Sequence, residues 1–215
     1  MISNEREYRS FNIEKRAKQD NDESDYIVEG YASTFEEYTL YESEDYIWRE
    51  RIEPKAFDEA DLTDVVFLLD HTGRVYARTK NDTVELSVDD KGFFTRTDLS
   101  KTSASRSVYE DIEAGNYSQM SFAFTAAEDR YEEKRAEGEK TVFTRIIDRI
   151  KKVYDISAVG FPANPTTNIG VATRAAFDGA IERLTAERLE AEQRRNEVER
   201  QRLALKLKIM EGKTS

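Results

Sequence analysis

The chain of 215 residues contains no cysteine and a single histidine, His71. The absence of cysteine excludes a disulfide framework and thiolate metal ligands, and a lone imidazole excludes the usual zinc sites, which combine several cysteines or histidines. Acidic residues are plentiful, but no loop has the ligand spacing of an EF-hand. The sequence therefore predicts no metal and no cofactor.

Long apolar runs are also missing. No stretch approaches the roughly 18 apolar residues that a membrane-spanning helix needs. The first 19 residues lack the apolar centre of a signal peptide. We therefore expect a soluble protein that stays in the compartment where it is made.

Basic residues are outnumbered, with 33 Lys and Arg against 44 Asp and Glu and a net charge of -11. Residues 175–215 hold 9 basic and 8 acidic residues, so the remaining 24 basic and 36 acidic residues give residues 1–174 a net charge of -12. Surfaces that bind nucleic acid or anionic membranes are usually basic. The composition predicts no nucleic-acid partner and no membrane partner.

The length suits one core with an appendage. Apolar and aromatic residues concentrate between residues 26 and 172, so we expect a folded domain over residues 1–172 and a charged helical tail over residues 173–215. From Ala175 to about Met210, opposite charges recur at helical spacing, as in Glu190 and Arg194. The apolar stripe of this helix is interrupted, which leaves a coiled coil as one interpretation.

The first domain consists mainly of short segments that alternate apolar and polar residues, which is typical of strands. Few helices are indicated: a short one after Pro54 and a longer one over residues 103–115. About seven strands with few helices predict a mainly β fold with helices (α+β), with a barrel or closed sheet as its core. The expected strands cover residues 6–14, 25–35, 46–52, 64–71, the hairpin 83–99, 117–127, and one or two between 141 and 165.

Three side chains could carry chemistry: His71 after the apolar run VVFLLD, Ser121 in an alternating strand, and Asp155 in KVYDISAVGF. Ser121 alternates with bulky residues, so it faces away from them. A serine hydroxyl becomes a strong nucleophile when an imidazole takes its proton, and the imidazole needs a third group to hold its tautomer. Because the chain has one imidazole, any such site must use His71.

Structural interpretations of these residues remain open from the sequence alone. A lone histidine at a strand end is more often a surface or hydrogen-bonded residue than a catalyst. Fifty residues separate His71 from Ser121 and thirty-four separate Ser121 from Asp155, so only a folded sheet could bring them together. Ser121 has rivals in Ser118, Ser103, Ser105 and Ser107, and Asp155 could instead pair with Arg149, Lys151 or Lys152.

Five motifs occur in a fixed order: EGYA at 29–32, PKAF at 54–57, LDH at 69–71, QMSFAF at 119–124 and DISAVGFPA at 155–163. As a set they resemble the prohead (capsid maturation) serine protease family of tailed phages, which is distantly similar to herpesvirus assemblin. The resemblance covers roughly residues 8–172. Gln119 stands where many relatives have glycine, and Gly160 stands where threonine or valine is common.

The resemblance implies an assemblin-like β-barrel surrounded by short helices. It also implies a serine endopeptidase with Ser121 as the nucleophile, His71 as the general base and Asp155 as the third member, at the start of the strand that follows the nucleophile's strand. Asp148 and Asp70 are alternatives for the third member. Oxyanion donors are expected from backbone N–H groups, and the turn at residues 159–164 is a candidate.

The resemblance further implies the partners: the major capsid protein and its scaffolding segment, cleaved inside the assembling prohead in the host cytoplasm. Self-cleavage is expected within residues 164–178 or shortly beyond, which would make the tail removable, and a homodimer is implied by analogy with assemblin. Two other classes stay open, a non-catalytic capsid assembly or scaffolding protein that acts through the C-terminal helix, and a structural virion or adaptor module. No residue pattern predicts the cleavage-site specificity.

Overall fold

The computed structural model describes residues 6–12, 25–135, 140–160, 179, 181, 186, 189–190 and 192–202. The chain divides into two compact units, Met1–Asn168 and Ile169–Ser215. The first unit is mainly β with one α-helix, which confirms the predicted mixture of strands and helices. Its strands are β1 (Glu7–Asn12), β2 (Ile27–Thr34), β3 (Tyr38–Glu42), β4 (Tyr46–Ile52), β5 (Val66–Leu69), β6 (Thr72–Arg78), β7 (Val84–Val88), β8 (Gly92–Asp98), β9 (Gln119–Lys134) and β10 (Thr141–Val159). Its helices are the 3-10 helices η1 (Pro54–Phe57) and η2 (Thr79–Asn81) and the α-helix α1 (Ser103–Glu113).

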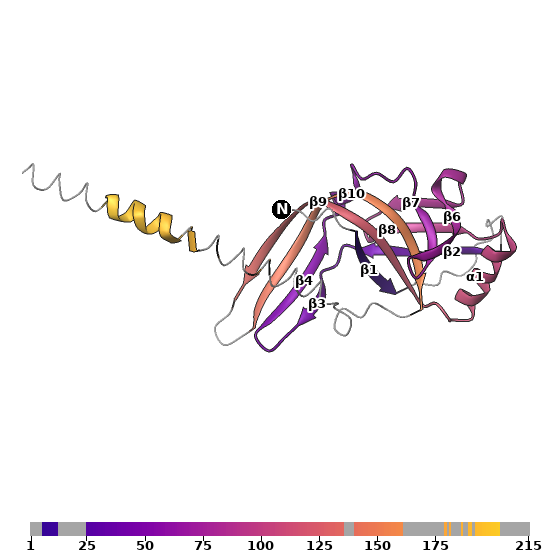
Figure 1. Ribbon diagram of the computed structural model, residues 1–215, viewed down its shortest axis with the longest axis horizontal. Coiled ribbons are helices and arrows are strands. Elements are labelled where there is room, and N and C mark those ends of the chain that lie inside the picture. The colour runs from indigo at the N-terminus through magenta and orange to yellow at the C-terminus, as the bar shows by residue number, and fades with distance from the viewer. Residues whose placement is uncertain are drawn as a thin grey trace, which may run out of the picture. The chain divides into compact units, whose positions relative to one another are not determined.

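The described strands form two sheets. The larger has the order β1-β9-β10-β4-β3, with β5 paired to β10 and β6 paired to β5, and the smaller has the order β2-β8-β7. Two long curved strands, β9 and β10, run side by side through the middle of the larger sheet (Figure 1). No ladder between described strands joins the two sheets, so the predicted closed barrel is not confirmed.

On the side away from β9, strand β10 pairs with two different strands along its 19 residues. Its first part, residues 141–147, pairs in parallel with β4, and its last part, Asp155–Ala158, pairs in parallel with β5. At about 3.3 Å per residue a strand of this length extends past one neighbour and reaches a second. Several register shifts against β9 occur between Ile147 and Asp155, which is where such a strand can bend.

The bulky face of β9 packs into an aromatic core. The Phe122 and Phe124 rings stack with centroids 4.7 Å apart, and Phe57 stacks on Phe93 at 4.4 Å. All four residues are buried. Burying an aromatic side chain of this size stabilises a fold by about 1.5–3 kcal/mol, so this core fixes which face of β9 is turned inward. Ser121 lies between the bulky residues Met120 and Phe122 of β9, and its side chain is directed to the other face of the strand, as the alternation predicted.

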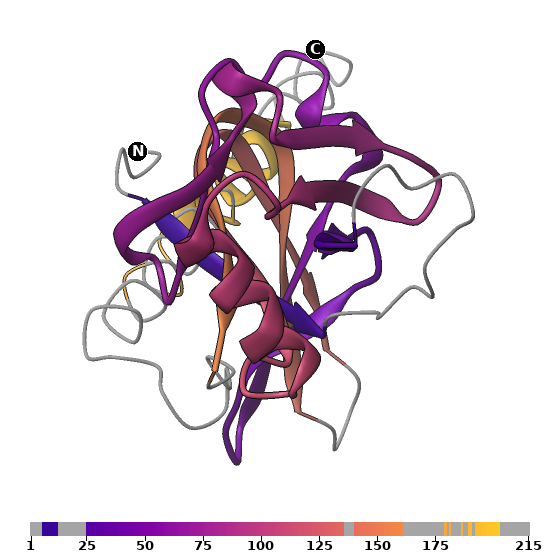
Figure 2. The same cartoon turned by 90° about the vertical axis from the view of Figure 1, so that its right-hand side faces the viewer.

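Helix α1 lies at the end of this unit opposite the β3–β4 hairpin and faces the viewer in Figure 2. The Thr102 side chain accepts the N–H of Ser105 at 3.0 Å, and Gly115 has a φ of 85° just beyond the helix end. A capping side chain at the start and a left-handed glycine at the end are the usual boundaries of a helix. The predicted helix is therefore confirmed, whereas the one after Pro54 is a single 3-10 turn.

The predicted hairpin is formed by β7 and β8. Gly92 follows its turn, and a Cβ at that position would lie 2.1 Å from the Ser33 carbonyl oxygen. Only glycine fits so close an approach of two backbones. The β2–β8 ladder has a register shift between Tyr31 and Ser33.

In the second unit, residues 192–202 are helical. Arg194 donates to Glu190 at 3.1 Å, one of the predicted i,i+4 pairs, and the apolar Leu189 and Val198 are exposed. Much of the predicted helix, from Ala175 to about Met210, lies outside the described residues, so its full length is not confirmed. Within the described part of the chain, no helix is both long enough and apolar enough to cross a membrane.

Candidate active site

His71 lies in a two-residue hairpin turn between β5 and β6. Leu69 pairs with Thr72 across the turn, and the two residues between them, Asp70 and His71, have φ values of 46° and 56°. Positive φ at both central positions is the pattern of a type I′ turn, whose twist matches that of the flanking strands. Each left-handed residue other than glycine costs about 1 kcal/mol, so the turn needs support from its surroundings.

Strand β10 supplies that support through Asp70. The Asp70 N–H donates to the Ala158 carbonyl at 3.1 Å, and the Asp70 carboxylate accepts the N–H of Gly160 at 3.2 Å. Asp70 is thus tied by its backbone to β10 and by its side chain to the residue that follows β10. This double attachment holds the neighbouring His71 over β10.

Strand pairing brings the other two predicted residues to the same place. In the β9–β10 ladder Ser157 lies opposite Ser121 and Asp155 lies opposite Ala123. In the β5–β10 ladder Asp155 lies opposite Val66, and Ala158 lies opposite Leu69, the residue before the turn. Two central strands and one hairpin therefore converge, although their residues are far apart in the sequence.

The His71 imidazole bridges the serine and the carboxylate. Its Nε2 lies 2.6 Å from Ser121 Oγ, and its Nδ1 lies 2.6 Å from Asp155 Oδ1. Ser121 and Asp155 are buried, and 16% of the His71 side chain is exposed. With Nδ1–H donating to the carboxylate, Nε2 is left as an acceptor for the serine proton. The arrangement can therefore pass a proton between a hydroxyl and an imidazole whose orientation is held.

Ser157 is a fourth member that sequence reasoning did not single out. Its hydroxyl donates to Asp155 Oδ1 at 2.9 Å and lies 3.3 Å from His71 Nδ1, and the residue is fully buried. It follows Asp155 by two positions on the same strand, which places both side chains on one face. That period-2 spacing within the DIS motif was the available signal.

The alternatives for the third residue lie elsewhere. Asp70 binds the Gly160 N–H, and Asp148 forms an ion pair with Arg130 at the exposed surface. Asp155 itself lies in the last third of β10 and not at its start, because β10 is one continuous strand.

Two of the cations that could have paired with Asp155, and one of the alternative serines, make other contacts. Lys152 pairs with Asp61 at 2.6 Å, and Arg149 pairs with Glu59 and Glu128. Neither of these two cations is therefore the partner of Asp155. Among the rival serines, Ser105 donates its hydroxyl to the Tyr76 carbonyl at 2.8 Å.

The turn expected to supply oxyanion donors and the region expected to be self-cleaved lie largely outside the described residues. Of the turn at residues 159–164, Val159 and Gly160 are described, and the Gly160 N–H is occupied by Asp70. The region expected to be self-cleaved, residues 164–178, lies outside the described residues. Within the described ranges, no group of three or more acidic, cysteine or histidine side chains is placed to hold a metal ion.

Strand β1 covers β9, the strand that carries Ser121. It pairs antiparallel with the edge of β9, with Ser10 opposite Ser121. The Ser121 hydroxyl lies 2.9 Å from the Arg9 carbonyl oxygen, and the Tyr8 ring meets the His71 ring edge-on at 4.6 Å. The sequence indicated a strand here, but nothing in it indicated contact with His71 and Ser121.

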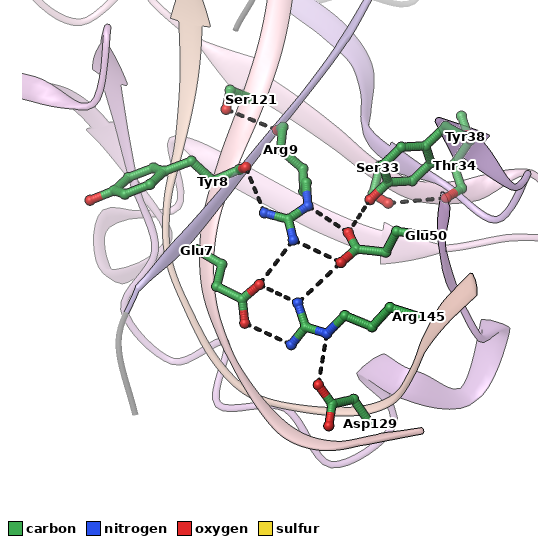
Figure 3. A network of polar contacts seen from close by, with 10 residues as sticks. All are labelled: Glu7, Tyr8, Arg9, Ser33, Thr34, Tyr38, Glu50, Ser121, Asp129 and Arg145. Carbon is green, nitrogen blue, oxygen red and sulfur yellow. Dashed lines mark hydrogen bonds and ion pairs between the residues drawn. The ribbon is translucent and has the colours of Figure 1, made fainter. Parts of the chain in front are cut away.

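Charged side chains attach β1 to the rest of the sheet (Figure 3). Arg9 donates to both oxygens of Glu50, at 2.5 and 2.7 Å, and Tyr38 donates to the same carboxylate at 2.5 Å. Arg145 lies beside them, donating to Glu50 at 3.1 Å and to Asp129 at 2.7 Å. Arg145 also binds Glu7 of β1, so both charged residues of the strand are paired.

This network is buried, and its electrostatics favour the charged forms. Burial by itself would raise the pKa of Glu50, but the adjacent Arg9 guanidinium outweighs burial and lowers the pKa to about 2. Burial would lower the pKa of Arg9, and the Glu50 charge raises it above its ordinary value. Removing one member of a buried pair leaves an uncompensated charge, at a cost of about 3–5 kcal/mol.

A family model described as caudovirus prohead serine protease matches residues 11–179. No curated protein and no solved structure matches the chain significantly. The matched range contains the hairpin of His71, the strand of Ser121 and the strand of Asp155. With a match over most of its length, the chain belongs to the caudovirus prohead serine protease family.

Proposed function

We propose that the protein is a serine endopeptidase of capsid maturation in which Ser121 is the nucleophile, His71 the general base and Asp155 the residue that orients His71. One observation carries the proposal: a single imidazole lies 2.6 Å from both the Ser121 hydroxyl and the Asp155 carboxylate. Membership of the prohead serine protease family supports the reaction class.

The reaction follows from these contacts. As Ser121 Oγ attacks the scissile carbonyl carbon, its proton moves to His71 Nε2, and Asp155 stabilises the imidazolium. The imidazolium then gives that proton to the leaving amine, which departs and leaves an acyl-enzyme on Ser121. A water molecule repeats the sequence, releasing the carboxylic acid and restoring the serine hydroxyl. Ser157 holds the Asp155 carboxylate in place throughout.

The substrates in this proposal are the scaffolding segment of the major capsid protein and the chain itself, inside the prohead in the host cytoplasm. Residues 1–172 are the protease domain, and residues 173–215 are a helical tail that is released by self-cleavage within residues 164–178. The exposed helix at residues 192–202, with Arg194 paired to Glu190, suits a segment that makes reversible contacts during assembly. A homodimer remains part of the proposal by analogy alone.

Co-expression with the capsid precursor tests this function. The wild-type chain should process the precursor, and Ser121→Ala and His71→Ala should not, while Ser118→Ala serves as a matched serine control. A serine-reactive phosphonate should label wild-type protein at Ser121, as identified by peptide mass spectrometry. If Ser121→Ala still processes the precursor, the proposed catalyst is wrong.

The same experiment distinguishes the proposed peptidase from a non-catalytic assembly protein. An assembly or scaffolding protein that acts through its C-terminal helix needs residues 175–215 but neither Ser121 nor His71. Capsid assembly that survives both point substitutions and is lost on deletion of the tail would identify that class.

A further inference from the structure

The candidate nucleophile is closed off by the chain's own first strand. Ser121 is fully buried, and β1 pairs along β9 on both sides of it, from Gln119 to Phe124. A peptide substrate must bring a carbonyl group to Ser121 Oγ. The position that this carbonyl must take is now occupied by Arg9 of β1.

Three contacts of β1 lie where an extended peptide substrate has to bind. The carbonyl that meets the Ser121 hydroxyl belongs to Arg9. The residue before it, Tyr8, packs on the His71 ring, and the Arg9 side chain reaches Glu50. An extended peptide added to a sheet edge is recognised in this way, by main-chain pairing and by subsites for alternate side chains.

The Arg9 contact is unproductive for cleavage. The Ser121 hydroxyl has one proton, and a proton donated to the Arg9 carbonyl cannot at the same time be taken by His71 Nε2. The carbonyl oxygen itself meets the hydroxyl, whereas attack requires the carbonyl carbon to face it and the oxygen to face hydrogen-bond donors. Strand β1 can therefore fill the site without being cut.

The subsite beside Glu50 requires a cation. Without β1, the charged groups left in the network are Glu50, Asp129 and Arg145, which sum to a net charge of -1. The net charge is the same with β1 in place, because Glu7 and Arg9 cancel, so what Glu50 loses is its bound cation. Glu50, whose side chain is fully buried with β1 in place, would then lose its bidentate partner. A guanidinium from a bound peptide restores the two hydrogen bonds to Glu50 and brings the net charge of these three groups from -1 to 0.

We propose that β1 is a pseudosubstrate strand, and that the place it occupies is the substrate site for an extended peptide with arginine or lysine immediately before the cleaved bond. The residue before the basic one packs on His71, where Tyr8 packs now. This inference rests on the proposed peptidase function and adds to it both the substrate class and the strand that must leave.

The first test is the rate at which a serine-reactive phosphonate labels Ser121. Arg9→Gln in the full chain removes the charge that binds Glu50, so β1 should detach more often and labelling should be about tenfold faster, the factor that corresponds to about 1.4 kcal/mol. Arg6→Gln is the matched control, since Arg6 stacks on the Tyr154 ring at 4.1 Å and takes no part in the network. It should label at the wild-type rate.

The second test measures cleavage of quenched fluorescent peptides by Arg9→Gln protein. The peptides carry the β1 sequence EYRSFN with Arg, Lys, Gln or Glu at the third position. We expect kcat/KM to be at least tenfold higher for Arg and Lys than for Gln, and lowest for Glu. The double variant Arg9→Gln, Glu50→Gln, if its circular dichroism shows a folded protein, should lose the preference for the basic peptides.

The outcomes distinguish this inference from the function on which it rests. Equal labelling of Arg9→Gln and Arg6→Gln, or cleavage of the four peptides at similar rates, overturns the pseudosubstrate while leaving the peptidase intact. The peptide comparison does not depend on whether the double variant folds. An absence of both Ser121 labelling and peptide cleavage in every variant overturns both proposals.

Discussion

Ser157 lies directly opposite Ser121 in the β9–β10 ladder, and its hydroxyl donates to Asp155 rather than to the serine across from it. Two buried serines on neighbouring strands thus lie close to the two ring nitrogens of one histidine. One is 2.6 Å from Nε2 and the other is 3.3 Å from Nδ1. The proposed mechanism gives them different roles, because Nδ1 is occupied by Asp155 and Nε2 is the nitrogen that can accept a proton from Ser121.

The Asp155→Asn substitution should remove most activity without unfolding the protein. An amide has nearly the same shape as a carboxylate, but it can hold the imidazole in the wrong tautomer and cannot stabilise the imidazolium. The same change in the Ser-His-Asp triad of trypsin lowers kcat by about 10⁴. We expect kcat on a peptide substrate to fall by about 10³–10⁴ with little change in KM. Asp148→Asn, which removes a surface pairing with Arg130, should leave kcat close to the wild-type value.

The Ser157→Ala substitution should lower kcat by about tenfold, the effect of losing a contact of about 1.4 kcal/mol, while KM stays constant. Asp155 then keeps its histidine partner but loses the hydroxyl that orients it. The pH dependence of kcat should shift as well, which a loss of packing alone would not cause. Ser157→Thr, which retains a hydroxyl, should recover most of the activity. Wild-type kcat and pH profile in Ser157→Ala would exclude a positioning role.

The hairpin turn predicts a difference between two substitutions of Asp70. Asparagine tolerates positive φ and its side-chain oxygen can still accept the Gly160 N–H, so Asp70→Asn should remain close to wild type in stability. Asp70→Val loses the acceptor and places a β-branched side chain at positive φ, which is strongly disfavoured. We expect a melting temperature several degrees lower and a loss of activity larger than the stability change explains, because His71 is displaced. Equal activity of both variants would contradict the anchoring role.

The network around β1 predicts a loss of stability in acid. The pKa of Glu50 is lowered to about 2, so its contribution is complete above the ordinary value near 4.5 and is lost as the pH falls through about 2. The difference corresponds to about 3 kcal/mol. Denaturant unfolding between pH 6 and pH 2 should show this decline in the wild type.

Glu50→Gln supplies the comparison for that measurement. The variant should be less stable at pH 6, since Arg9 and Arg145 lose a buried counter-charge, but it should decline less steeply on acidification. Glu85→Gln, which changes an exposed carboxylate, should follow the wild-type curve. Parallel curves for the wild type and Glu50→Gln would show that Glu50 keeps its ordinary pKa.

Much of the site could be predicted from the chain alone. One histidine in 215 residues leaves a single choice of imidazole, and the alternation around Ser121 determines which face of its strand the hydroxyl occupies, because side chains on a strand repeat every two residues. The motif set led to the family, which the family match over residues 11–179 confirms. The α1 helix and the β7–β8 hairpin were also predictable, since local capping and turn residues specify them.

Tertiary structure alone decided the rest, because pairing between strands depends on the whole sheet and not on neighbouring residues. That β10 would bend past β4 to meet β5, and that the two sheets would stay separate, has no local signal. The contact of Asp155 with His71 Nδ1 follows from that register. The burial of Ser121 under β1, with Arg9 paired to Glu50, likewise joins residues 41 positions apart through long-range packing, which no periodicity in the sequence encodes.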